Sequence, residues 1–468
     1  MSAIIDPDKE NFRDTITTIE DDGSRKWIFA KKPKGFFYRI RSALSWVYLI
    51  VFFGLPWLQY EGEPLFMLNV IKRKFIIFGL HFGVQDLIVF GIAMLTFVVF
   101  IVLFTVAFGR LFCGWACPQT IFMEMVFRKI EYWIDGDAQQ QRNLAKSEWN
   151  QKKIFKRALK YVIFYLIALA ISHTFLAYII GISEVRQIVT EPATKHIMGL
   201  MAMLLFSGAF FVVYAFFREQ ICIVACPYGR LQGVMLDKNS IVVAYDYVRG
   251  EPRGKVQKNE LQKTGDCIDC KACVHVCPTG IDIRNGTQLE CVNCTACIDA
   301  CDDIMAKINK PLGLIRYASE SNISTGKKTN WFSPRLMAYS AVLLILLGLL
   351  SFTFMSHSSI DASVLRTPGQ FYQENADGTT SNLYNFNVTN KKNKPMKLEF
   401  KLMNQSGEIK IIGNPSLTIP AEEEKRGQFF VVIPNNKIPA SKTDLLIAIY
   451  GNGELLKEQK TTFMAPVE

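Results

Sequence analysis

Two closely spaced cysteine runs constrain this chain more than any other feature of its sequence. The first run reads C-x2-C-x2-C-x3-C-P from Cys267 to Pro278, and the second repeats the cysteine spacing from Cys291 to Cys301. This is the ligand spacing of a two-cluster bacterial ferredoxin, in which three thiolates of one run hold one [4Fe–4S] cluster and the fourth reaches the other cluster. The spacing therefore predicts a segment that folds around two clusters.

The same logic assigns a ligand set to each cluster. The first cluster takes Cys267, Cys270, Cys273 and Cys301, and the second takes Cys291, Cys294, Cys297 and Cys277. Disulfide bonds are disfavoured because they need an oxidising compartment, and zinc sites use two CxxC pairs with a longer gap. Asp302 stands after the last cysteine, where a proline is common. We expect this difference to alter the local turn and the potential rather than the ligation.

Five apolar stretches are long enough to cross a bilayer, which takes about 20 residues. They cover approximately Leu44–Tyr60, Leu87–Phe108, Tyr161–Gly181, Ile197–Phe217 and Leu336–Met355. Half of the 468 residues are hydrophobic although 53 are basic and 42 acidic, so the two kinds of residue must be segregated along the chain. The pattern predicts an integral membrane protein with about five transmembrane helices.

The basic residues predict its orientation. Seven Lys and Arg residues lie between Arg25 and Arg41, and ten lie between Arg110 and Lys160 against five acidic residues. By the positive-inside rule these segments and the ferredoxin-like segment are cytoplasmic, so the chain after Met355 lies on the outer side of the membrane. The net charge of +11 then suits an anionic lipid surface better than nucleic acid.

The last hundred residues predict a separate β module. Four stretches alternate or run apolar, namely Leu383–Asn390, Lys397–Leu402, Gln428–Ile433 and Leu445–Tyr450. Turn residues such as Gly451-Asn452-Gly453 separate them. Short strands at this spacing indicate a small β-sandwich.

These features give five expected domains. They are an N-terminal cytoplasmic segment (1–43), a four-helix membrane domain (44–217), a ferredoxin-like α+β domain (218–335), a fifth transmembrane helix (336–355) and a periplasmic β domain (356–468).

The other four cysteines form two C-x3-C-P motifs, one from Cys113 to Cys117 and one from Cys222 to Cys226. Each motif follows an apolar span and an arginine, Arg110 or Arg218 in turn. A spacing of four places both thiols on one helical face. Because both spans cross in the same direction, the four thiols can converge. They could hold a soft metal such as Cu(I), a further iron–sulfur cluster or a redox-active dithiol, or they could be buried structural residues.

Histidine and methionine offer weaker candidates. His173 lies inside a predicted span, where an ionisable residue is a functional hypothesis by default. His275 lies between ferredoxin-type cysteines and is expected to tune a cluster rather than bind it. At the outer end of the fourth predicted span, four residues could offer soft ligands to copper: His196, Met198, Met201 and Met203.

Together these segments resemble the CcoG family of cytochrome c oxidase accessory proteins, also called RdxA or FixG. The resemblance rests on Cys113-Gly-Trp-Ala-Cys-Pro, on Cys222-Ile-Val-Ala-Cys-Pro-Tyr-Gly-Arg, and on the stretch from Cys277 to Cys291. It implies an immunoglobulin-like C-terminal domain and the reduction of Cu(II) to Cu(I) for assembly of cbb3-type cytochrome c oxidase. Expected partners are then a copper chaperone or copper-transporting ATPase, oxidase assembly factors and an unidentified electron donor.

On this resemblance, two clusters supply electrons to copper bound at Cys113, Cys117, Cys222 and Cys226. The membrane part also resembles the quinol-dehydrogenase-like proteins of nitrate and nitrous oxide respiration. A quinol-linked electron conduit is therefore one alternative, and a non-enzymatic assembly scaffold with a redox sensor is another. No G-x-G-x-x-G loop within a βαβ pattern is present, so NADH is not the expected donor.

Overall fold

The computed structural model describes residues 16–20, 22–60, 62–71, 74–78, 80–83, 86–254, 265–326, 333–355, 360–369, 371–390, 394–413, 417–421 and 423–466. Its contacts form two compact units. The first comprises Met1–Leu58 and Phe90–Leu350, which include all twelve cysteines, and the second comprises Gln59–Val89 and Ser351–Glu468. The segment Gln59–Val89, which the sequence leaves between two spans of the membrane domain, thus groups with the C-terminal module.

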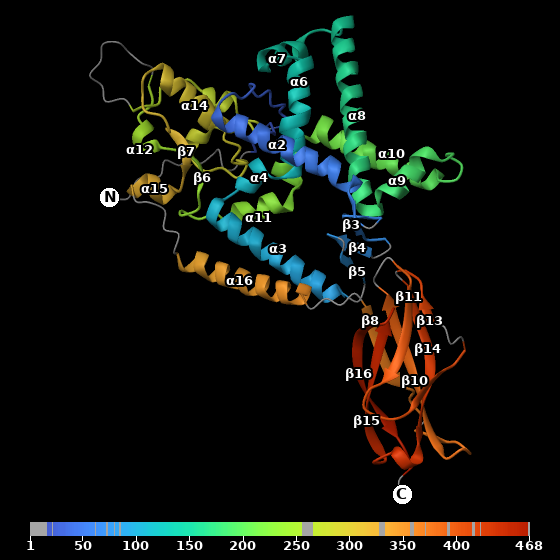
Figure 1. Ribbon diagram of the computed structural model, residues 1–468. Helices are drawn as coiled ribbons and strands as arrows, with labels where there is room; N and C mark the ends of the chain where they lie inside the picture. The colour runs from blue at the N-terminus through green and yellow to red at the C-terminus, as the bar shows by residue number, and fades with distance from the viewer. Residues whose placement is uncertain are drawn as a thin grey trace. The chain divides into compact units, whose positions relative to one another are not determined.

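Five helices in the described part of the chain are long and apolar enough to cross a membrane (Figure 1). They are α2 (Phe36–Gly54), α3 (Leu87–Phe108), α8 (Gln151–Ile180), α10 (Ile197–Val212) and α16 (Pro334–Met355). The predicted number of spans is confirmed. A 3₁₀ turn, η2 (Leu55–Trp57), continues α2, and a π-helix, η5 (Val213–Phe217), continues α10.

Two of these helices begin earlier than the sequence predicts. The first starts at Phe36 rather than Leu44, and the third starts at Gln151 rather than Tyr161. Hydropathy ends a span where charged residues begin, but a helix continues wherever its backbone is capped and packed. Asn150 caps the third helix by accepting a hydrogen bond from the Lys153 amide at 2.8 Å, which allows a charged N-terminal extension.

Short helices connect α3 to α8. They are α4 (Leu111–Trp115), α5 (Pro118–Thr120), the π-helix η4 (Ile121–Phe127), α6 (Arg128–Ile134) and α7 (Ala138–Lys146). Phe127 is fully buried, with its ring centroid 4.9 Å from that of Phe164 and 4.6 Å from that of Tyr214. This aromatic packing fixes the π-helix η4 against α8 and η5. A helix that the sequence did not predict, α9 (Ile182–Thr190), follows α8.

A buried ionic network anchors the chain just before the second C-x3-C-P motif. Both guanidinium nitrogens of Arg218 donate to Glu131, at 3.1 and 2.8 Å, and Lys160 donates to Glu131 and Asp135 at 3.3 and 2.6 Å. Burial alone would raise the pKa of Glu131, but the charges of Arg218 and Lys160 lower it to about 2. The carboxylate therefore stays ionised and holds Arg218 in place.

The ferredoxin-like part consists of one two-stranded sheet and short helices. Strand β6 (Val242–Tyr245) pairs antiparallel with β7 (Ile315–Ala318). The predicted loops leading into helices are confirmed, because the two cysteine runs enter α13 (Ala272–His275) and α14 (Ala296–Lys307).

The two cysteine runs share one backbone conformation. Asp269 and Lys271 have positive φ values of 53° and 56°, and the equivalent Asn293 and Thr295 have φ values of 53° and 64°. Residues other than glycine rarely adopt this left-handed backbone conformation, and those that do are often found where a loop binds a ligand. The first run turns at Pro278, after α13 has ended. By contrast Asp302 lies inside α14, where proline would break the helix, and this explains the missing proline.

The C-terminal module is an immunoglobulin-like sandwich of two sheets. One sheet has the order β12-β14-β10-β8 with β9 on β10, and the other has the order β13-β11-β15-β16. Their bounds are β8 (Ile360–Arg366), β9 (Gln373–Glu374), β10 (Thr379–Asn390), β11 (Met396–Leu402), β12 (Glu408–Ile411), β13 (Leu417–Ile419), β14 (Glu424–Pro434), β15 (Lys442–Gly451) and β16 (Glu454–Met464). Tyr384, Phe429 and Phe463 are among the fully buried side chains between the sheets.

The four predicted strands are confirmed within β10, β11, β14 and β15, but β8, β12, β13 and β16 were not predicted. The long strand β16 has the sequence ELLKEQKTTFM and lies at a sheet edge, where charged residues are tolerated and hide the alternation. The same compact unit contains a small sheet of β3 (Phe66–Asn69), β4 (Lys74–Ile77) and β5 (Leu80–Phe82), and a two-stranded pair of β1 (Gln59–Tyr60) and β2 (Glu63–Pro64).

Candidate metal centres

One cavity in the ferredoxin-like part is lined by the cysteines assigned to the first cluster. It has a volume of about 20 Å³, and apolar side chains such as Met305 and Leu314 form its walls. Its cysteines are Cys267, Cys270, Cys273 and Cys301. Among these thiols Cys270 is exposed, whereas Cys267 and Cys273 are buried. This cavity therefore has a face close to solvent.

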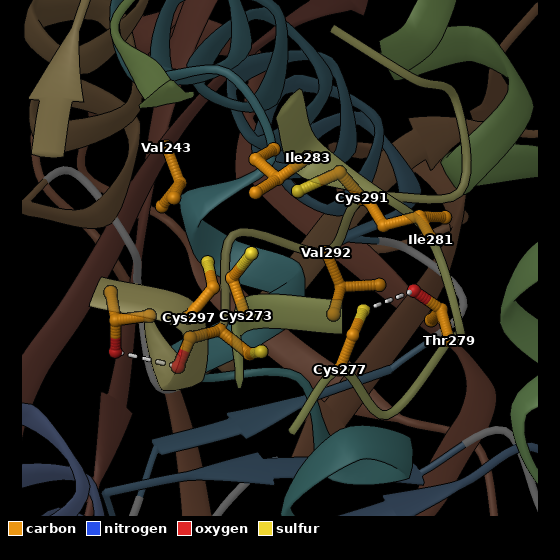
Figure 2. A pocket seen from close by; sticks show the side chains of 11 residues that line it. Val243, Cys273, Cys277, Thr279, Ile281, Ile283, Cys291, Val292 and Cys297 are labelled. Atoms are coloured by element: carbon orange, nitrogen blue, oxygen red, sulfur yellow. Dashed lines mark hydrogen bonds between the residues drawn. The ribbon is translucent and has the colours of Figure 1, made fainter. Parts of the chain in front are cut away.

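A second cavity, also of about 20 Å³, is lined by the cysteines assigned to the second cluster. These are Cys277, Cys291, Cys294 and Cys297. Figure 2 shows Cys277, Cys291 and Cys297 around this space, with the Thr279 hydroxyl 3.3 Å from the Cys277 sulfur. Cys273 of the first set also lines this cavity, so the two cavities are neighbours. Two similar pockets, each with four soft thiol donors in apolar walls, suit two [4Fe–4S] clusters.

Burial favours the protonated form of thiols in both cavities. Burial raises the pKa of Cys273 to about 12 and that of Cys294 to about 11. Thiolates are the forms that bind metals, so cluster insertion must release protons from both cavities. An apolar pocket of this kind also excludes water from the bound centre.

The two C-x3-C-P motifs have equivalent local structures. Cys117 directly precedes α5, and Cys226 directly precedes α11 (Pro227–Met235). Both cysteines have extended backbone, and the following proline occupies the first helical position, where its fixed φ is favourable. The first cysteine of each motif lies one turn earlier, in α4 for Cys113 and in the π-helix η6 (Ile221–Ala225) for Cys222. The Gly229 amide donates to the Cys226 sulfur at 3.4 Å.

The structure brings the two motifs together. The Cys113 thiol donates to Gln232 of α11 at 2.9 Å, and Gly229 of α11 has no room for a side chain between Arg110 and the Cys222 carbonyl. Burial first, and then the neighbouring thiols of Cys117, Cys113 and Cys226, raise the pKa of Cys222 to about 12, against an opposing effect of Arg110. We call these four cysteines the four-thiol site.

The sulfurs are not gathered around one point, however. Within the described ranges, no three His, Cys, Asp or Glu side chains are arranged to hold a single metal ion. This statement covers the ferredoxin-type cysteines as well as the four-thiol site.

The four-thiol site lies directly against the second cavity. Cys113 packs in one buried cluster with Val292 and Cys294. Gly114 contacts the same loop so closely that a β-carbon there would overlap the Val292 carbonyl and lie 2.8 Å from the Asn293 oxygen. Arg41 joins the two parts by donating from Nε to the Gly114 carbonyl at 3.0 Å and from Nη1 to the Cys294 carbonyl at 2.8 Å.

The histidine and methionine candidates are not brought together. The Nδ1 atom of His173 lies 2.7 Å from the Leu169 carbonyl of its own helix, and His196 contacts Glu191 at 3.2 Å. Met198 and Met201 are exposed, whereas Met203 is buried. The His275 side chain is exposed and lines neither cavity.

Sequence reasoning missed Arg41, Gly114 and Gln232, and it gave Arg110 no role beyond its position before a motif. Arg41 lies 72 residues before Cys113, so no local spacing relates it to the cysteines. Gly114 inside the first motif was the one available signal, because a glycine has no side chain and so permits another stretch of backbone to approach closely.

Comparisons with known proteins agree with this arrangement. A family described as a 4Fe-4S dicluster domain matches residues 217–320, and the Ig-like fold at the C-terminus of FixG matches residues 350–466. A 4Fe-4S binding domain matches residues 90–136, which include Cys113 and Cys117. Protein RdxB of Cereibacter sphaeroides is 32% identical over 444 residues, which cover 90% of this chain and 92% of RdxB.

The chain belongs to the RdxA/FixG family. RdxA of Cereibacter sphaeroides is 32% identical over 445 residues, covering 90% of this chain and 93% of RdxA. Nitrogen fixation protein FixG of Rhizobium meliloti is 30% identical over 411 residues, covering 78% of this chain and 77% of FixG. The resemblance seen in the sequence is thereby confirmed. With the dicluster match, it identifies this RdxA/FixG-family member as a membrane-bound iron–sulfur electron-transfer protein with two clusters.

Proposed function

We propose that this protein reduces Cu(II) to Cu(I) at the four-thiol site, for assembly of cbb3-type cytochrome c oxidase. The observation that carries the proposal is the direct packing of Cys113 and Gly114 against the Cys291–Cys294 loop. Soft thiolates favour Cu(I) over harder ions. A thiol set beside an electron source therefore suits a metal ion that must gain one electron and then remain bound as the softer product.

The chemistry balances with one electron for each copper ion. In this proposal the two [4Fe–4S] clusters, held by the cysteines that line each cavity, supply one-electron transfer when bound. The electron comes from a low-potential one-electron carrier protein or from quinol, and Cu(II) gains it to become Cu(I). Copper binding displaces the thiol protons, which burial otherwise retains: it raises the pKa of Cys113 to about 11.

The cellular setting is part of the proposal. The charge pattern supports a bacterial inner membrane location with the ferredoxin-like part in the cytoplasm and the C-terminal sandwich in the periplasm. A copper chaperone or a copper-transporting ATPase would exchange Cu(I) with the four-thiol site, and oxidase assembly factors would bind elsewhere on the protein.

Replacing all four cysteines of the four-thiol site by serine tests the proposal. Cu(I) formation, followed with a Cu(I)-specific chelator, should fall to background while the iron content and the cluster absorption remain. A matched control is the double variant Met198→Ala and Met201→Ala, which removes exposed soft ligands at another place and should retain activity. Unchanged copper reduction in the four-serine variant would contradict the proposal.

A second candidate is a membrane electron conduit with a third cluster at the four-thiol site. The match of a 4Fe-4S binding domain to residues 90–136 favours it, since that segment holds one of the two motifs. Iron analysis separates the candidates, because about twelve irons per chain indicate a third cluster and about eight indicate two. Cluster reduction by quinol would support the conduit further.

A further inference from the structure

Two buried arginines beside the second cavity form no ion pair with a carboxylate in the described part of the chain. Arg41 is 6% exposed and donates only to backbone carbonyls, those of Gly114 and Cys294. Arg110 is 3% exposed and donates from Nη1 to the Leu289 carbonyl, and its buried Nε has no hydrogen-bond partner. Burying a guanidinium is costly unless negative charge lies nearby.

The nearby groups that become negatively charged when they bind a metal are the cysteines. The charge of Arg110 acts on Cys291 of the second cavity and on Cys113 and Cys222 of the four-thiol site. The charge of Arg41 acts on Cys294. Thiolate-bound metal centres are anionic, so a bound centre supplies both arginines with a counter-charge.

One acidic side chain also acts on this region, but it has its own partner. The charge of Glu124 acts on Cys294, and Glu124 lies 3.4 Å from Arg128. It therefore compensates Arg128 rather than Arg41 or Arg110.

The first cavity differs from the second because its arginine is paired with carboxylates. Its arginine, Arg284, donates to Asp282 at 2.8 and 2.6 Å and to Asp269 at 2.5 Å. The carboxylate of Asp302 acts on Cys301 in addition. The guanidinium of Arg284 is thus already compensated by carboxylates, and the other cation lining the first cavity, Lys271, is exposed to solvent.

We propose that Arg41 and Arg110 hold the reduction potential of the second cluster above that of the first. The reduced form of a cluster carries one more negative charge than the oxidised form, so uncompensated positive charge stabilises it. Burial acts in the opposite direction, because it disfavours the more highly charged form. Two unpaired guanidiniums outweigh burial here, since the same lack of water that disfavours charge also strengthens their attraction.

This ordering gives electron transfer a direction. An electron enters the first cluster near the exposed Cys270 and then moves to the second cluster, which has the higher potential. There it lies beside the four-thiol site. The inference rests on the cluster assignment of the proposed function, but it holds for copper or any other final acceptor.

A redox titration monitored by EPR tests the proposal on the full-length protein, purified anaerobically in detergent and without copper. The native protein should show two midpoint potentials. Arg110→Met and Arg41→Met should each lower the higher midpoint, whereas Arg110→Lys should keep it. Arg284→Met should lower the lower midpoint instead, because it leaves Asp269 and Asp282 uncompensated.

Arg316→Met is the matched control, because the Arg316 side chain is 42% exposed, pairs with Asp246 at 2.8 Å and lines neither cavity. It should move neither midpoint. Iron analysis shows whether each variant retains both clusters, and if Arg110→Met loses iron, then Arg41→Met and Arg110→Lys carry the test. Equal midpoints in the native protein would overturn the proposal, as would a shift confined to the lower midpoint or no shift at all. Correct midpoints without copper reduction would contradict the proposed function and leave this inference intact.

Discussion

The two cysteine runs fold alike but lie in unlike surroundings. Each run has two left-handed residues at equivalent positions, and each contributes to a cavity of similar volume. The first cavity has an exposed cysteine and an arginine bound by two aspartates, whereas the second is covered by the membrane part and its arginines lack carboxylates. The repeat thus sets the number and spacing of the ligands, whereas the charged residues around each cavity differ: Asp269, Asp282 and Arg284 come from the same segment as the first run, and Arg41 and Arg110 come from distant parts of the sequence.

The arginines before the two C-x3-C-P motifs show the same contrast. Arg218 is held by the ionised Glu131, and Arg110 faces thiols and backbone carbonyls. One arginine is therefore a structural anchor, and the other is a charge left available to a metal centre.

The largest expected effect comes from removing one ligand at each cluster in turn. Protein is reduced, freed of reductant and mixed with Cu(II), and Cu(I) is counted. The native chain should yield about two Cu(I), one from each cluster. Cys270→Ala should yield about one, and Cys294→Ala should yield none, because the first cluster acts only through the second.

Equal Cu(I) yields from the two variants would contradict the proposed order of electron transfer, since each cluster would then deliver its electron independently. Iron analysis on each variant confirms that only one cluster has been lost.

Glu131→Gln should cause the next largest effect, because it removes the carboxylate closest to the buried Arg218 and leaves only Glu219, whose Oε2 lies 3.7 Å from the Arg218 Nε. Breaking a buried ion pair costs about 3–5 kcal/mol of unfolding free energy. The loss would be detected as a lower thermal midpoint of the protein in detergent. The pKa of Glu131 is about 2 in the folded protein, below its usual 4.5. The stabilisation it gives is therefore present above about pH 4.5 and is lost as the pH falls toward 2.

As the pH is lowered from about 5 to about 2, the thermal midpoint of the native protein should therefore fall more than that of the variant, because only the native protein has the Glu131 carboxylate to protonate. If both proteins respond equally to pH over that range, Glu131 is not the anchor of Arg218.

Gly114→Ala tests the close contact between the four-thiol site and the second cavity. The added methyl group meets backbone carbonyls that cannot rotate away, so we expect a loss of about 1–3 kcal/mol in stability and slower Cu(I) formation. Gly208→Ala is the matched control, because nothing lies within 4 Å of a β-carbon there. Equal rates in both variants would show that this contact does not set the electron-transfer distance.

Local sequence patterns predicted what depends on neighbouring residues. The cysteine spacing predicted which thiols line each cavity, and hydropathy predicted the five spans. It placed the start of α8 too late, because the cap at Asn150 is independent of hydropathy. Edge strand β16 was missed because its exposed lysines and glutamates obscure the alternation.

The charge environment of the sites could not be predicted in this way. Arg41 and Cys294 are 253 residues apart, and only the fold brings them within 2.8 Å. Arg110 and Arg218 precede their motifs in similar positions, yet one pairs with Glu131 and the other does not. Such differences follow from tertiary contacts and leave no trace in local spacing.

Rapid-freeze EPR after mixing the reduced protein with Cu(II) tests most directly whether the four-thiol site draws electrons from the second cluster. The cluster signals are assigned beforehand from the Arg110 and Arg284 variants. With one Cu(II) per protein, the Cu(II) signal and the second-cluster signal should fall together, and the second-cluster signal should then recover as the first-cluster signal is lost. Lasting loss of the second-cluster signal while the first cluster stays reduced, or loss of Cu(II) while both clusters stay reduced, would contradict the proposed order of electron transfer.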